Sequence, residues 1–119
     1  MEVLVAEQPW VVAVADTRLL RTQGLMGVTE LMNVDGMLFV FEEPVRVSFH
    51  MRDTLIPLDI AFFAGDGSLI DRFTMTPCDE DPCPTYPAAA PVKYAIETTV
   101  GGFDGLGSLR LDVGVVRSP

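Results

Sequence analysis

The stretch LDIAFF at 58–63, followed directly by AGDG at 64–67, decides the fold class of this chain. Residues 58–63 are apolar on both faces of an extended backbone, with Asp59 as the one exception. Such a run is typical of a central strand covered on both sides. The glycine-containing tetrapeptide indicates a hairpin turn, so the chain is expected to return as a second strand over 68–75. This unit predicts a β-sheet protein.

Period-two alternation of apolar and polar residues predicts three further strands, at 45–52, 92–100 and 109–116. Segments 10–15 and 37–41 are expected as two more strands, and 37–41 is again apolar on both faces. In 92–100, one face carries Val92, Tyr94, Ile96, Thr98 and Val100, and the other carries Lys93, Ala95, Glu97 and Thr99.

Helix is scarce in the expected fold. Asp16 is the expected N-cap of a short helix over 17–23 that Gly24 ends, and 102–107 is a weak second helical turn because it is rich in glycine. Five prolines in 76–91 predict an irregular loop. The pattern predicts a mainly β single domain over 1–119, either a β-sandwich or a partly open barrel of short strands with one or two short helices.

The composition narrows the classes of function. The chain has 119 residues, 49% apolar content and a formal net charge of −9, so it is neither disordered nor suited to a nucleic-acid partner. No apolar run is long enough to span a membrane, and the first residues do not form a signal peptide. The compartment stays open, cytoplasmic or exported with a trimmed signal.

The two cysteines, Cys78 and Cys83, bracket an acidic tetrapeptide within the proline loop. Their spacing allows a disulfide, two free thiols or half of a soft-metal site, and we favour a structural or free-thiol role over metal. A copper-handling hypothesis would add His50, Met51 and Met75 as soft ligands, but the alternation sets Met51 opposite His50. No metal or other cofactor is therefore expected.

The sequence lacks the catalytic residues and motifs that most standard enzyme classes require. The chain has one histidine and one lysine, no G-x-S-x-G motif and no phosphate-binding glycine loop. What remains is the polar face of 45–52, where Arg46, Ser48, His50 and Arg52 alternate. It is either an anion-binding face with His50 as general acid or base, or, as we favour, a solvated strand face with ordinary ion pairs.

Asp59 interrupts an apolar run and needs a partner if it is buried, such as Arg52, Thr54 or backbone N–H groups. If 45–52 pairs with 58–63, Asp59 would approach Arg52 or His50. We favour a structural anchor over a catalytic carboxylate.

Several segments resemble, in order and wording, the bacterial and archaeal family called domain of unknown function 192. These are 24–27, 36–41, 48–63 and 77–86, and the resemblance runs from about 12 to 116. It implies a small, mainly β fold, exported in some members, and no established activity. Members commonly read Ser-Phe-Trp-Met-Lys-Asn-Thr where this chain has His50, Arg52 and Asp53, so a site that relied on the tryptophan would be altered here.

Together these features favour a non-catalytic binding or interaction module whose surface joins the 48–59 turn to the 76–91 loop, with a small molecule or protein as partner. The expected ligand-binding residues are Phe49, His50, Arg52, Asp53, Thr54, Asp59 and Tyr86. The alternative is a hydrolase or lyase that acts on a small anionic substrate through His50, Arg52 and Asp59.

Overall fold

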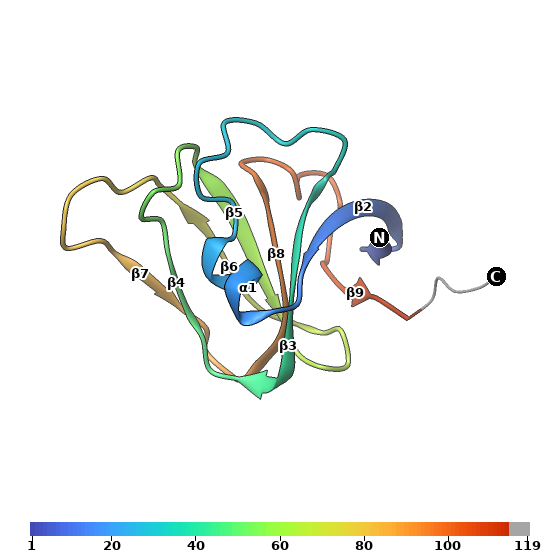
Figure 1. Cartoon of the computed structure of the whole chain (residues 1–119). Helices are drawn as coiled ribbons and strands as arrows, with labels where there is room; N and C mark the ends of the chain where they lie inside the picture. The colour runs from blue at the N-terminus through green and yellow to red at the C-terminus, as the bar shows by residue number, and fades with distance from the viewer. Residues whose placement is uncertain (115–119) are drawn as a thin grey trace.

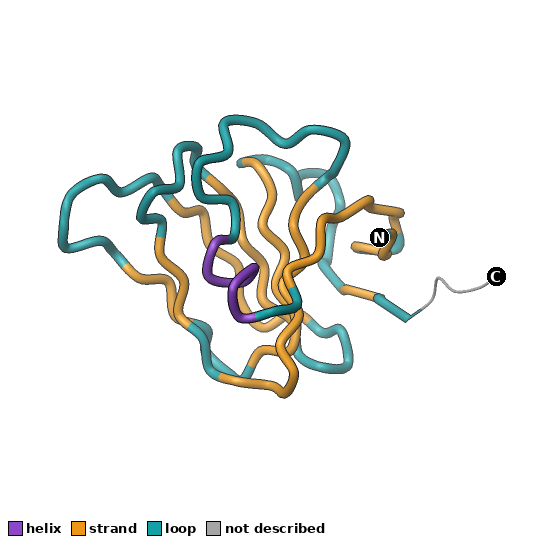
Figure 2. Tube along the Cα trace, in the orientation of Figure 1, coloured by secondary structure: helices purple, strands orange, loops and turns teal. Residues whose placement is uncertain are grey.

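The strands form one seven-stranded sheet and one two-stranded sheet, with a single short helix across one face of the larger sheet (Figures 1 and 2). The structure is a computed structural model that describes residues 1–114. In chain order the elements are β1 (Glu2–Val5), β2 (Gln8–Ala15), α1 (Arg18–Gln23), β3 (Gly36–Val45), β4 (Ser48–His50), β5 (Leu58–Phe63), β6 (Leu69–Met75), β7 (Thr85–Pro87), β8 (Val92–Thr99) and β9 (Leu111–Asp112).

The order of strands in the large sheet is β6-β5-β8-β3-β2-β1-β9. Strands β2 and β3 run parallel, and the other neighbours in this sheet pair antiparallel. Strand β5 lies between β6 and β8, and all six of its residues are buried. The expected central strand at 58–63 and its hairpin to 68–75 are therefore confirmed.

The large sheet curls until its two edges meet. Residue Ser68, just before β6, bridges to Arg110, just before β9, and the N–H of Leu111 donates to the carbonyl of Gly67 at 2.9 Å. Side chains from strands across the sheet converge on the concave face, where the rings of Trp10 and Phe103 stack 5.4 Å apart. The fold is a mainly β half-barrel, as the partly open barrel prediction expected.

The convex face of the sheet carries a second core, which α1, the loop after it and the β4–β7 pair cover (Figure 1). Phe49 of β4 is the link between the two sheets, because its ring lies 5.1 Å from Phe39 and 5.5 Å from Phe62. Aromatic contacts of this kind contribute about 1 kcal/mol each beyond burial. They hold β4 against the sheet, beside α1.

Two expected segments of the chain differ in the structure. The stretch 45–52 is not one strand, since β3 ends at Val45 and only Ser48–His50 is extended as β4. Strand β4 pairs with β7 (Thr85–Pro87), inside the loop that was expected to be irregular, and not with 58–63. This pairing joins residues more than thirty positions apart, which local alternation does not reveal.

The ends of the other elements also need correction. Thr17, not Asp16, caps α1, because its hydroxyl oxygen accepts the N–H of Leu20 at 3.1 Å. Residues 102–107 form turns and no helix. Strand β9 covers only two residues of the expected 109–116, and 115–116 lie outside the described residues, while β1 was not expected at all. No helix within 1–114 has the length and apolarity to cross a membrane.

Candidate functional site

A cavity of about 310 Å³ lies between α1, the convex face of the sheet and β4. Its lining comes from α1 and the turn after it, from β3, from β4 with nearby Thr54, and from β8. The volume is at the lower end of the range of small-molecule pockets. We call this space the Glu97 cavity, after the residue at its base.

Glu97 projects from β8 onto the convex face of the sheet. Its neighbours across the sheet are Met37 of β3 and Ile60 of β5, and Ile96 points the other way into the half-barrel. The residue is 4% exposed and lines the cavity, and a Cβ on Gly24 would lie 3.8 Å from one of its carboxyl oxygens. Glu97 therefore forms the base of the cavity, beneath the turn that ends α1.

The carboxyl group of Glu97 has no hydrogen-bond or salt-bridge partner within residues 1–114. Burial alone raises its pKa to about 8, so the group is mostly un-ionised at neutral pH. An unsatisfied buried polar group costs about 1–3 kcal/mol of stability. A buried, unpaired carboxyl that faces a cavity is characteristic of a ligand-binding or active site.

The walls of the Glu97 cavity are largely apolar. Phe39 and Phe41 from β3 and Phe49 from β4 form one side, and Leu25 and Met26 follow α1 on the other. Aromatic walls with a few polar groups are the usual lining of sites for small organic molecules.

The mouth of the cavity is basic. Arg21 is held in place, because its guanidinium donates to the carbonyl of Val40 at 2.9 Å and lies 5.2 Å from the centroid of the Phe41 ring. Arg18, one turn earlier on α1, is exposed and has no partner among the described residues. His50 completes the mouth, and its Nδ1 accepts the N–H of Arg52 at 3.2 Å, which leaves Nε2 as a donor.

Three of the expected binding residues, Phe49, His50 and Thr54, line this cavity together. Asp53 lies beside them with a structural role, since its backbone has a positive φ of 59° and its carbonyl accepts the N–H of Gly27 at 2.9 Å. Tyr86 pairs with Phe49 across the small sheet and does not line the cavity.

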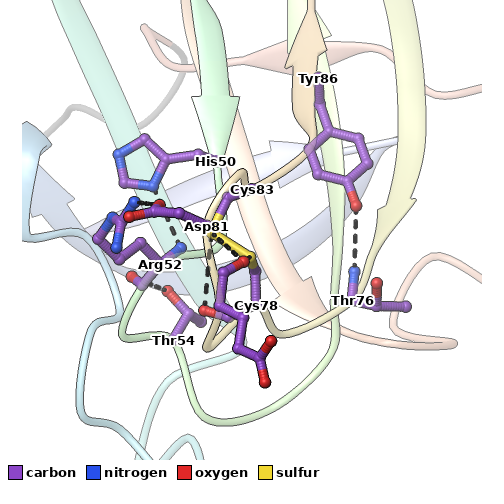
Figure 3. Close-up of a disulfide and its surroundings, with 9 residues drawn as sticks. His50, Arg52, Thr54, Thr76, Cys78, Asp81, Cys83 and Tyr86 are labelled. Atoms are coloured by element: carbon purple, nitrogen blue, oxygen red, sulfur yellow. Dashed lines mark hydrogen bonds and ion pairs between the residues drawn. A yellow bond between two sulfur atoms is a disulfide. The ribbon is translucent and has the colours of Figure 1, made fainter.

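Arg52 turns away from the Glu97 cavity toward the proline loop. It forms a salt bridge with Asp81, beside the disulfide between Cys78 and Cys83 (Figure 3). In the same region the hydroxyl of Tyr86 accepts the N–H of Thr76 at 3.4 Å. The salt bridge ties the loop to the 50–54 segment and gives Arg52 a role in holding the loop, while the Tyr86–Thr76 hydrogen bond lies within the loop.

The disulfide also bears on the copper hypothesis. Cys78 and Cys83 are bonded to each other and offer no thiolate, while Met51 and Met75 are buried in the core. Within residues 1–114, no three His, Cys, Asp or Glu side chains are close enough together to hold a metal ion. Cys78 packs against the same buried cluster as Met51 and Met75, but as half of a disulfide it offers no thiolate to a soft metal.

Asp59 does not approach Arg52 or His50, contrary to the pairing considered from the sequence. Its two carboxylate oxygens accept hydrogen bonds from the hydroxyl of Thr74 at 2.6 Å and from the backbone N–H of Gly101 at 2.9 Å. The residue is buried and does not line the Glu97 cavity. It anchors the turn after β8 to β5 and β6, which is the structural role that we favoured.

Replacing Asp59 with alanine is expected to lower the free energy of unfolding by about 2–3 kcal/mol, because the substitution removes the charged acceptor of two part-buried hydrogen bonds. The urea denaturation midpoint at neutral pH measures the change. Asp16→Ala is the matched control, since Asp16 is exposed and is not the helix cap. Equal effects of the two substitutions would contradict the anchoring role.

Sequence reasoning missed Glu97, Arg18 and Arg21. The available signal for Glu97 was its place next to Ala95 and Ile96 in a strand with few charges, which is typical of burial on both faces. The two arginines lie three apart in the only helix of the described chain, a spacing that puts them on one side of it.

The fold and this site define a small, mainly β domain with a ligand-sized cavity on the convex face of a curled sheet. The chain belongs to the family DUF192, described as uncharacterized ACR, whose model matches residues 2–112. No curated protein matches the sequence.

Two solved structures share the fold. One is a protein of unknown function from Novosphingobium aromaticivorans, with 30% identity and a TM-score of 0.81 over 94% of this chain and 82% of that one. The other is called a "putative transcription regulator" from Sinorhizobium meliloti, with 26% identity and a TM-score of 0.73 over 93% and 92% of the two chains. These similarities establish the family and the fold, and they establish no activity for this chain.

Proposed function

We propose that the chain, as one domain over residues 1–119, is a non-catalytic binding module that takes a small molecule into the Glu97 cavity. The observation that carries the proposal is the buried, unpartnered carboxyl of Glu97 at the base of a ligand-sized cavity. A ligand that bonds to this carboxyl would remove the energetic cost of its isolation.

The geometry favours binding over the hydrolase or lyase alternative. Of the three residues in that mechanism, only His50 lines the cavity, whereas Arg52 is paired with Asp81 and Asp59 is fully engaged elsewhere. General acid–base catalysis needs its groups within hydrogen-bond reach of one substrate. The three residues do not meet this condition.

The proposed binding surface overlaps only in part with the one expected from the sequence. Segment 48–54 contributes to it, but its second half is α1 and not the 76–91 loop. In this proposal the loop does not contact the ligand and instead holds β4 in place, because β7 of the loop pairs with β4. A nucleic-acid partner does not suit a net charge of −9, because binding to phosphates needs a basic surface. The regulator name is that of the Sinorhizobium protein.

The experiment is a fragment screen followed by amide NMR with uniformly labelled protein. Compounds that bind are expected to shift the amide resonances of 18–26, 48–54 and 95–97, which surround the cavity. In Ser48→Trp an indole fills the mouth without removing a core side chain, since Ser48 is exposed. It is expected to weaken binding about ten-fold or more.

Thr76→Trp is the matched control, because Thr76 is also exposed and does not line the cavity. It should leave the affinities unchanged. Fragments that shift only resonances elsewhere, or that bind Ser48→Trp as well as the wild type, would overturn the proposal.

A further inference from the structure

We infer that the ligand of the Glu97 cavity is a small aryl carboxylate, with its carboxylate at Arg18 and Arg21 and its ring against the phenylalanine wall. The inference rests on the proposed function and names the chemical class of ligand for the same site. Three observations carry it: the charge at the mouth, the character of the walls and the chemistry of the base.

The mouth selects for negative charge. The titratable or charged side chains that line the cavity are Arg18, Arg21, His50 and Glu97, and the acid among them is buried at the base. Arg18 has no partner among the described residues, so its guanidinium can form a bidentate salt bridge with a carboxylate. Arg21 uses one N–H on the carbonyl of Val40 and keeps other donors available.

The walls of the cavity favour a ligand with an aromatic ring. Phe39 and Phe49 already meet edge to face, with ring planes at 86°, and Phe41 lies under the guanidinium of Arg21. A ring inserted here would contact aromatic faces and edges on this side and the side chains of Leu25 and Met26 on the other. The volume of about 310 Å³ suits a single ring with a short side chain.

The base of the cavity offers a neutral hydrogen-bonding group. Because burial keeps Glu97 mostly un-ionised at neutral pH, it presents one hydroxyl donor and one carbonyl acceptor to a ligand. A neutral hydroxyl at the far end of the ring, as in a phenol, can accept from the donor of Glu97 and donate to its acceptor. An ammonium ligand with its phenol at Glu97 would place its positive charge beside Arg18 and Arg21, and repulsion between like charges opposes its binding.

The overall charge of −9 does not oppose this selectivity. At physiological ionic strength, charges separated by more than about 8 Å are largely screened in solvent. The arginines at the mouth are therefore the charges that a bound carboxylate feels most strongly.

The test uses three probes with one ring and one phenol that differ in the charge of the side chain: para-hydroxyphenylacetate, tyrosol and tyramine. Isothermal titration at neutral pH gives the affinities, and amide NMR locates the site. We expect the carboxylate to bind about ten-fold more tightly than neutral tyrosol, and the ammonium compound most weakly. Arg18→Gln should reduce the affinity for the carboxylate toward that for tyrosol and leave tyrosol binding unchanged.

Arg46→Gln is the control for net charge, because Arg46 is exposed and lies outside the cavity lining. Tyramine binding as tightly as the carboxylate, or an unchanged carboxylate affinity in Arg18→Gln, would overturn the inference. Failure of all three probes while library fragments still occupy the cavity would also overturn it and leave the proposed function standing. The proposed function fails separately if no compound shifts the cavity amides.

Discussion

Replacing Glu97 with glutamine is expected to raise the stability of the protein at alkaline pH, by up to about 5 kcal/mol relative to the wild type. Burial raises the pKa of Glu97 from 4.5 to about 8 in the folded state. The folded protein therefore holds this proton more tightly than the unfolded chain does. The stabilising contribution is complete below pH 4.5 and is lost as the pH rises through that value toward 8. Glutamine keeps the shape of the protonated acid and does not ionise.

Urea denaturation at a series of pH values measures this effect as the difference between the two stability curves. The curves should lie close together in acid and diverge as the pH rises, with the glutamine variant the more stable. Glu43→Gln is the control, because Glu43 is exposed and its substitution should shift stability very little at any pH. Parallel curves for wild type and Glu97→Gln would show that the carboxyl is not buried as described.

Replacing Gly67 with alanine is expected to destabilise the protein by about 3 kcal/mol or more, because two costs combine. Gly67 has a positive φ of 89°, which alanine adopts only with strain. In addition, a Cβ at this position would lie 2.1 Å from the carbonyl oxygen of Leu111, which is too close for any contact. This is the point where the two edges of the curled sheet meet, so the substitution pushes them apart.

The control for this prediction lies two residues earlier in the same turn. A Cβ on Gly65 would meet only the side chain of Lys93, at 4.0 Å, and its φ is not in the left-handed region. Gly65→Ala should change the thermal midpoint by a few degrees at most, whereas Gly67→Ala should lower it by about 10 °C or more. Similar midpoints for the two variants would contradict the meeting of the sheet edges at Gly67.

The fold class was predictable because the patterns that define it are local. The apolar run at 58–63 and the turn that follows it specify a buried strand and a hairpin without reference to the rest of the chain. The pairing of β4 with β7 was not predictable, since it depends on how the proline loop folds back and on the disulfide that closes it. The expectation that Asp59 approaches Arg52 or His50 was wrong for the same reason, because it assumed that 45–52 pairs with 58–63.

The site was predictable only on its β4 side. Phe49, His50 and Thr54 were expected there because polar and aromatic residues are dense in that segment. Alternation in β8 could show that Ala95 and Glu97 share a face, but not that α1 and the small sheet cover that face. Whether a strand carboxyl is solvated or buried is decided by tertiary packing, and here packing buries Glu97 at the base of the cavity.

The most direct test of this account is the carboxyl ¹³C resonance of Glu97, followed by NMR from about pH 4 to about pH 10 in the free protein and with a cavity-binding fragment. We predict a titration midpoint near 8 in the free protein, in keeping with the buried carboxyl, and a clear displacement of that midpoint when the fragment is bound. A midpoint near 4.5 in the free protein, or one that bound fragments do not move, would contradict a ligand site built on Glu97.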